Sequence, residues 1–177
     1  MRKKILTILL ILICAISYSQ NDTIIDHKLN YKVVFLSKSH FSSKNSDSAL
    51  GKINFYRYNS IYEGDIYAIS MSEFTELKHK LSEKEVAAMV VGFKKGFSNS
   101  LTKEGRECNF ISEKKFKFKN EFEAIEFLGK INNQIDFKMN FILKGNITYT
   151  LLVIGQTEST NAQFFMNSFD FIDSNGN

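Results

Sequence analysis

The chain of 177 residues has no proline and no tryptophan, and it has only two cysteines. One of these, Cys14, lies in an N-terminal segment that we expect to be removed, so Cys108 is the single thiol of the mature chain. A single cysteine excludes an intramolecular disulfide. We therefore expect the stability of the fold to come from the packing of side chains.

Motifs that would bring catalytic or metal-binding chemistry are missing as well. The sequence has no G-x-S-x-G, no Walker motif and no G-x-G-x-x-G, the patterns of nucleophile elbows and phosphate-binding loops. Its three histidines, His27, His40 and His79, have no second ligand at the spacing of a metal site. We therefore expect no catalytic residue, no cofactor and no metal, and a protein that is not an enzyme.

The N-terminus has the layout of an export signal. Three basic residues at positions 2–4 precede an apolar run over residues 5–16, and serines stand at the two positions that a signal peptidase reads. This pattern predicts a signal peptide over residues 1–19, with cleavage before Gln20. The run is shorter than the roughly 20 apolar residues that span a bilayer. We expect an exported protein, periplasmic or extracellular, that is not an integral membrane protein after cleavage.

The overall positive charge belongs mostly to this segment. Its three basic side chains have no acidic counterpart, so cleavage reduces the 23 basic residues of the chain to 20, against 19 acidic ones. A nearly neutral mature chain lacks the basic footprint of a nucleic-acid-binding protein. We expect a partner, if there is one, to be another exported or envelope protein.

Residues 82–101 predict the one long helix of the chain. Ser82 and Glu85 have the spacing of a capping box, in which each side chain accepts the backbone N–H of the other residue. Six apolar residues then recur at steps of three and four, which places them on one face: Val86, Met89, Val90, Phe93, Phe97 and Leu101.

A second stripe of the same helix consists of small residues, Ala88, Gly92 and Gly96. Each glycine costs about 1 kcal/mol relative to alanine in a helix interior, so something must offset that cost. The favoured explanation is that the helix lies close against a sheet and the small residues make room. The alternative is a docking groove for a partner.

Alternation of apolar and polar residues predicts strands in most of the remaining chain. The expected strands are 31–37, 51–58, 65–72, 107–119, 134–144 and 147–155, with 38–48 as a loop or an edge strand. Residues 122–129 fit a strand or a helix, and their short length favours a strand. Within 107–119, the even-numbered residues of a regular strand would all point to one face. Cys108, Phe110, Phe116 and Phe118 are such residues, which predicts that they face the core together and that Cys108 is a buried structural thiol.

These elements define an α+β fold with a single domain over residues 30–172. We expect an antiparallel β-sheet with the long amphipathic helix and a short C-terminal helix over 160–169 packed on it. Residues 20–29 are expected to be a disordered lead-in and residues 173–177 a frayed tail.

The order of elements and several stretches resemble the PsbP-like family. These stretches are GKINFYRY, GDIYAISMSEF, FILKGNITYTLLVIGQ and FFMNSFDFI, and the anchors of the resemblance are Gly51, Tyr67, Asn146, Tyr149, Leu151, Gly155 and Phe169. The family includes the extrinsic P subunit of photosystem II and a Ran-binding protein of the Mog type. The resemblance implies a non-catalytic fold that docks on other proteins, but it carries over no residue with a known role, and the prolines common in bacterial relatives are absent here.

Two functions are therefore considered. The first is an exported protein-interaction module with Tyr56, Tyr58 and Tyr62 as the candidate contact surface, because exposed tyrosines are common at interfaces. The alternative is a carrier of a small ligand or lipid, with aromatic residues lining a cavity between sheet and helix. A third interpretation of the tyrosines is that they only cover a half-buried sheet.

Overall fold

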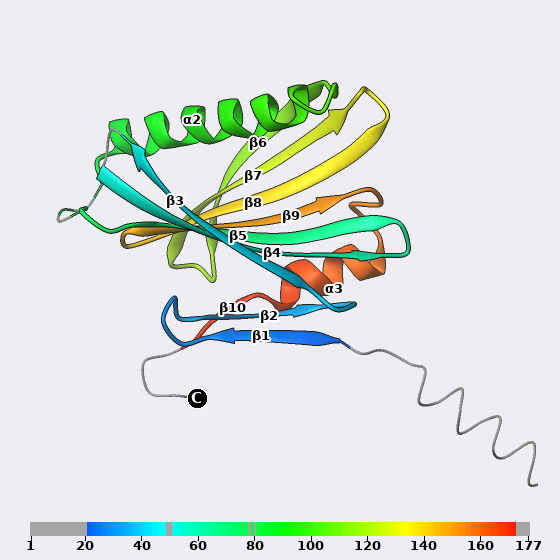
Figure 1. Cartoon of the computed structure of the whole chain (residues 1–177), viewed down its shortest axis with the longest axis horizontal. Helices are drawn as coiled ribbons and strands as arrows, with labels where there is room; N and C mark the ends of the chain where they lie inside the picture. The colour runs from blue at the N-terminus through cyan, green and yellow to red at the C-terminus, as the bar shows by residue number, and fades with distance from the viewer. Residues whose placement is uncertain (1–20, 49–50, 78, 80, 173–177) are drawn as a thin grey trace, which may run out of the picture.

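The computed structural model describes residues 21–48, 51–77, 79 and 81–172 (Figure 1). The predicted signal peptide and the predicted C-terminal tail lie outside these ranges and stay predictions. Within them, no helix is both long enough and apolar enough to cross a membrane.

The centre of the molecule is an antiparallel sheet of seven strands, in the order β3-β4-β5-β9-β8-β7-β6. Consecutive strands pair through short turns, and the pairing of β5 with β9 joins the two halves of the sheet. Its strands are β3 (His40–Ser48), β4 (Gly51–Tyr62), β5 (Asp65–Phe74), β6 (Cys108–Phe118), β7 (Phe122–Ile131), β8 (Ile135–Lys144) and β9 (Ile147–Ile154).

Three further strands form a small second sheet, in the order β1-β2-β10. They are β1 (Asp22–Asp26), β2 (Tyr31–Phe35) and β10 (Asp170–Phe171). The prediction of a disordered lead-in over 20–29 is therefore wrong for the residues of β1. All five of them pair with β2. The pairing satisfies their backbone N–H and C=O groups, which does not depend on the side chains.

The two helices lie on opposite faces of the large sheet (Figure 1). Helix α2 (Glu83–Thr102) covers one face, and helix α3 (Thr160–Ser168) lies with the small sheet on the other. The expected α+β class is thus confirmed, as are the helix predicted over 160–169 and the strand predicted over 122–129. The segment 38–48 is an edge strand rather than a loop.

Because neighbouring residues of a strand point to opposite faces, the large sheet separates two cores. Toward the small sheet, the fully buried rings of Tyr31, Tyr149 and Phe169 pack against one another. The Tyr149 hydroxyl also donates a hydrogen bond of 2.6 Å to the Leu29 carbonyl, which fastens the small sheet to the large one. Toward α2, the second core combines residues of β7 and β8, among them three phenylalanines, with residues of β5, β9 and α2.

Strand β6 contributes to both cores, which its parity did not predict. Cys108 and Phe110 pack into the α2 core, whereas Phe116 and Phe118 pack against the other one. A bulge causes the change, because Phe110 pairs with Gly129 and Ser112 pairs with Leu128, which leaves Ile111 as an extra residue. The prediction of one shared core face is therefore wrong.

The capping box of α2 is confirmed. The Ser82 hydroxyl accepts a hydrogen bond from the Glu85 backbone at 3.3 Å, and the Glu85 carboxylate accepts one from the Ser82 backbone at 2.8 Å. The Ser82 hydroxyl also donates to that carboxylate at 2.7 Å. Together with His79, these bonds from Ser82 lower the pKa of Glu85 to about 2.

The small residues of α2 do not lie against the sheet. A Cβ atom added to Gly92 or to Gly96 would meet no atom within 4 Å. The expectation that these glycines allow close packing of helix and sheet is therefore wrong. Phe93 and Phe97 of the same helix fill the space between helix and sheet instead. The centroid of each ring lies 5.3 Å from the centroid of a phenylalanine ring of the sheet.

We predict that the double variant Gly92→Ala/Gly96→Ala is more stable than the unsubstituted protein by about 1 to 2 kcal/mol, because alanine favours the helix and meets no neighbour. Denaturant unfolding measures this difference. As a contrast, Gly129→Ala should destabilise the fold, because a Cβ there would lie 2.4 Å from the Asn109 carbonyl oxygen. A loss of stability in the double variant would contradict the open placement of the stripe.

We also predict a pH-dependent contribution from the capping box. A carboxyl whose pKa is lowered on folding stabilises the folded state above its unfolded pKa, and that contribution is lost as the pH falls through the folded value. For Glu85 the interval runs from the ordinary 4.5 down to about 2. The difference in melting temperature between the unsubstituted protein and Glu85→Gln should therefore become smaller as the pH falls through this interval. Glu83→Gln is the control, because Glu83 lies in the same helical turn outside the capping box.

Candidate functional site

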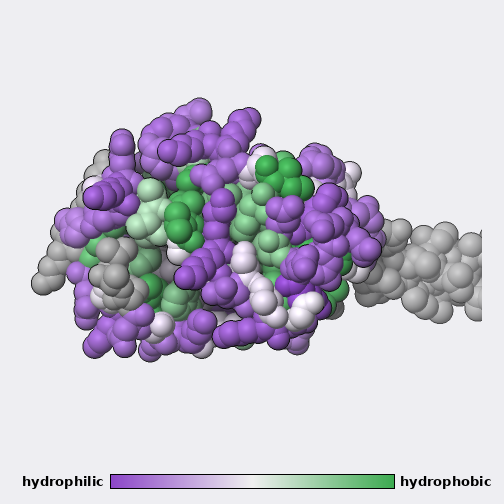
Figure 2. Space-filling model, turned by 90° about the horizontal axis from the view of Figure 1, so that it is seen from above, coloured by the Kyte–Doolittle hydropathy of each residue, from purple (hydrophilic) through white to green (hydrophobic). Residues whose placement is uncertain are grey.

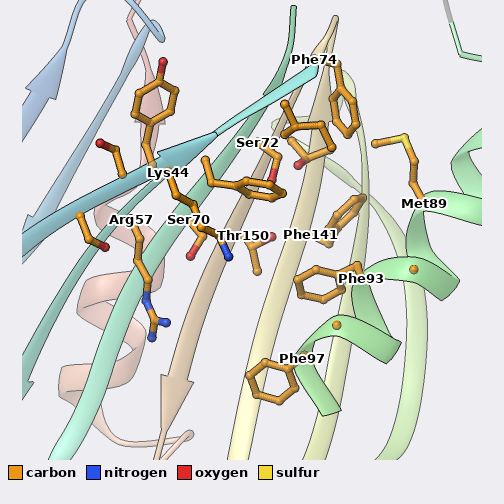
Figure 3. Close-up of a pocket in the computed structure, with 18 of the residues that line it drawn as sticks. Lys44, Arg57, Ser70, Ser72, Phe74, Met89, Phe93, Phe97, Phe141 and Thr150 are labelled. Atoms are coloured by element: carbon orange, nitrogen blue, oxygen red, sulfur yellow. The ribbon is translucent and has the colours of Figure 1, made fainter. Parts of the chain in front are cut away.

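An open groove of about 880 Å³ lies between α2 and the half of the large sheet that α2 leaves uncovered. Figure 2 looks onto the α2 face and shows hydrophobic residues exposed between hydrophilic ones there. The groove is bordered by α2 on one side and by β3 and β4 on the other, with β5 and β9 as its floor (Figure 3). It is larger and more apolar than the second concavity of the described chain, which lies beside α3.

The α2 side of the groove has two kinds of residue. Met89, Phe93 and Phe97 project from the helix toward the strands (Figure 3). Gly92 and Gly96 lie beside them, exposed and without a side chain. The phenylalanines thus keep the helix away from the sheet, and the glycines leave the resulting space empty.

Four hydroxyl groups form the floor of the groove. Ser70 pairs with Thr150 and Ser72 pairs with Thr148 across β5 and β9, so the four side chains occupy one compact block on the α2 face. Thr148 and Thr150 are buried. Within the described ranges, none of the four hydroxyls has a hydrogen-bond partner. They are therefore free to bond a guest.

Apolar side chains surround these hydroxyls. Ile53 and Phe55 come from β4, Phe74 from the end of β5, and Phe141 from β8. The Phe141 ring also packs on Phe93, with the two centroids 5.3 Å apart. The arrangement is that of a small-molecule site, which is mostly apolar and has a few polar groups at fixed places.

The charged side chains of the groove are Lys44, Arg57 and Glu85. Glu85 is occupied by the capping box and by His79, whose Nε2 lies 3.0 Å from its carboxylate. Lys44 extends over the Phe55 ring, with its ammonium 5.2 Å from the ring centroid. Neither Lys44 nor Arg57 forms an ion pair with any residue that the structure describes.

The three tyrosines of the candidate contact surface lie on β4, half-buried, and pack against the core beneath the large sheet. The Tyr56 hydroxyl accepts a hydrogen bond from Lys28 at 2.9 Å and donates one to Glu73 at 3.1 Å. Burial raises the pKa of Glu73, but the hydrogen bonds from Asn54 and Tyr56 outweigh it and the pKa is lowered. Tyr56 is therefore part of a hydrogen-bonded network with Lys28 and Glu73.

Tyr58 and Tyr62 have different surroundings. The Tyr58 ring packs on Phe41 of β3, with 4.8 Å between centroids, and burial followed by the charges of Asp26 and Asp22 raises its pKa. Tyr62 packs at the margin of the same core. The structure thus places the three tyrosines on one strand, packed against the core beneath the large sheet, although Tyr56 also borders the groove.

The remaining reactive side chains are scattered. Cys108 is half-buried, and burial raises the pKa of its thiol, which makes it a weak nucleophile. His27 and His40 are exposed. The part of the chain that the structure describes contains no group of three His, Cys, Asp or Glu residues that could hold a metal ion.

The sequence contained one signal of the groove. The stripe of Ala88, Gly92 and Gly96 is unusual in a helix interior, and all three residues line the groove. The hydroxyl floor was missed, although Ser70 and Ser72 alternate with buried residues along β5 and Thr148 and Thr150 do so along β9.

Comparison with known proteins gives a likeness of structure alone. No family model and no curated protein matches the sequence. Among solved structures, the solution structure of cyanobacterial PsbP (CyanoP) from Synechocystis sp. PCC 6803 matches with a TM-score of 0.58 at 11% sequence identity. The match covers 87% of this chain and 93% of that one. The chain therefore has the PsbP-like fold that the resemblance implied.

Proposed function

We propose that the protein is a non-catalytic carrier that holds a small apolar or amphipathic molecule in the groove between α2 and the large sheet. The observation that carries the proposal is the open, aromatic-lined space beside Gly92 and Gly96. A helix with two interior glycines is less stable than one with alanines, and here no close contact compensates for them. We propose that the two glycines leave space for a guest molecule, and that this role offsets their cost to the helix.

The dimensions and lining support this function. About 880 Å³ lies within the 300–1,000 Å³ typical of small-molecule sites. Phe93, Phe97 and Phe141 offer an apolar surface for the body of the guest, and the free hydroxyls of the floor can orient its polar part. The groove therefore favours the carrier over the interaction module as the first candidate.

The carrier is proposed to act outside the cytoplasm, in the periplasm or the medium, after removal of residues 1–19. The basic and apolar pattern at the N-terminus supports this part of the proposal. An apolar guest needs a protein to cross an aqueous compartment, which agrees with such a location.

A second candidate function is docking on another exported protein through the edge near β3. The observation that favours it is Phe41, whose side chain is 56% exposed while it packs on Tyr58. Large exposed rings at the edge of a sheet are common in interfaces. This surface lies apart from the groove, so the two functions are separable by mutation.

We predict that the neutral dye N-phenyl-1-naphthylamine binds the protein with a saturable rise in fluorescence. The variant Gly92→Leu/Gly96→Leu should weaken that binding by about tenfold or more, because both positions line the groove and an added Cβ atom there meets no neighbour, so the longer side chains occupy groove space. Fluorescence titration measures the change, and circular dichroism checks that the fold is kept.

The matched control adds leucines at the next positions of the same helix, Val91→Leu and Lys95→Leu, which are exposed and lie outside the groove lining. It should bind the dye as the unsubstituted protein does. Equal binding by both leucine variants, or no binding by the unsubstituted protein, would overturn the carrier proposal.

For the second candidate we predict that Phe41→Glu abolishes copurification of a stoichiometric partner from the producing cell's envelope or medium, while dye binding is unchanged. Tyr58→Ala is unsuitable, because Tyr58 packs against the core. Affinity purification followed by mass spectrometry reads the result. If the Phe41→Glu variant still copurifies the partner, the edge near β3 is not the docking surface.

A further inference from the structure

We infer that the guest of the groove is an amphiphile with one apolar chain and one anionic oxygen head group, and that Lys44 and Arg57 bind the head group. This inference rests on the carrier function proposed above and specifies its ligand class. A carboxylate and a phosphate monoester share the chemistry required, which is an anion with several acceptor oxygens.

The first argument is the lack of acidic partners for the two cations. Lys28, Lys94, Lys119, Lys130 and Lys138 each lie within 4 Å of an acidic oxygen. Lys44 and Arg57 have no such partner among the described residues. Other described lysines lack one too, but of these unpaired cations Lys44 and Arg57 are the two that line the groove. The Lys44 ammonium lies 5.2 Å from the centroid of the Phe55 ring, within the range of a cation–π contact.

The second argument is the proximity of the two cations to each other and to the floor. In the register of β3 and β4, Lys44 pairs with Phe55, and Arg57 pairs with Ser42. These two pairs are neighbours on the same face of the sheet, so the two cations lie diagonally across the two strands. Arg57 in turn stands opposite Ser70 of the hydroxyl block. One head group can therefore accept hydrogen bonds from a cation and from a floor hydroxyl together.

The third argument is the separation of charge from apolar surface. Lys44 and Arg57 lie on the strand side of the groove, and Met89, Phe93 and Phe97 lie across from them on α2 (Figure 3). An amphiphile with its head at β3 and β4 would direct its chain toward the phenylalanines.

Matched probes of twelve carbons test the inference: dodecanoate, dodecyl phosphate, dodecanol and dodecylammonium. The three ionic probes are used below their micelle concentrations and dodecanol below its solubility limit. Each probe displaces N-phenyl-1-naphthylamine from the full chain in a fluorescence titration. We expect the two anions to bind about tenfold or more tightly than dodecanol, which corresponds to one or two charge-assisted hydrogen bonds. Dodecylammonium should bind more weakly than dodecanol.

The variant Lys44→Gln/Arg57→Gln should lose this preference and retain its affinity for dodecanol. The matched control, Lys32→Gln/Lys103→Gln, removes two positive charges from exposed positions outside the groove lining and should keep the preference. Should the groove variant fail to fold, the salt dependence of the unsubstituted protein gives a second measurement. Anion affinity should fall between 50 mM and 500 mM salt, and dodecanol affinity should not.

The outcomes separate the two proposals. Displacement by dodecanol and the anions with equal affinity overturns the anionic head group and leaves the carrier function standing. Preference for dodecylammonium also overturns it. Failure of every probe and of the dye to bind overturns the carrier function itself. A preference between dodecanoate and dodecyl phosphate identifies which anion the site accepts better.

Discussion

The contact of Phe93 and Phe97 with the phenylalanines of β7 and β8 determines the architecture around the groove. These rings meet edge to face or tilted, with centroids 5.3 to 6.1 Å apart, which is the favourable range for aromatic pairs. Rings of this size hold the helix axis far from the strands. The helix therefore covers the phenylalanine-rich half of the sheet and leaves the half with hydroxyl side chains open.

Local patterns in the sequence predicted the elements well. The capping box indicates the start of α2, and the alternation of apolar and polar residues from Ile135 to Phe141 indicates β8. Such signals depend on nearest neighbours along the chain, so the sequence contains them in full. The sequence does not indicate strand β1, because Asp22 to Asp26 mixes charged and apolar residues, and even when paired with β2 its inner face is only half-buried.

The site was harder to predict, because its geometry depends on contacts between distant segments. Parity placed Cys108 and Phe116 on one face, whereas the single extra residue Ile111 reverses the faces of everything after it. Gly92 and Gly96 were noticed, yet the distance from helix to sheet depends on how Phe93 and Phe97 stack. Neither the bulge nor the stacking leaves a periodic trace in the sequence.

The exposure of Gly92 and Gly96 along the groove has a kinetic consequence. A guest held in an open groove can enter and leave without the slow opening of a lid, so its residence time depends on its own contacts. Exchange with another surface can begin while the guest is still partly bound. Such a site suits transfer by collision more than long-term storage.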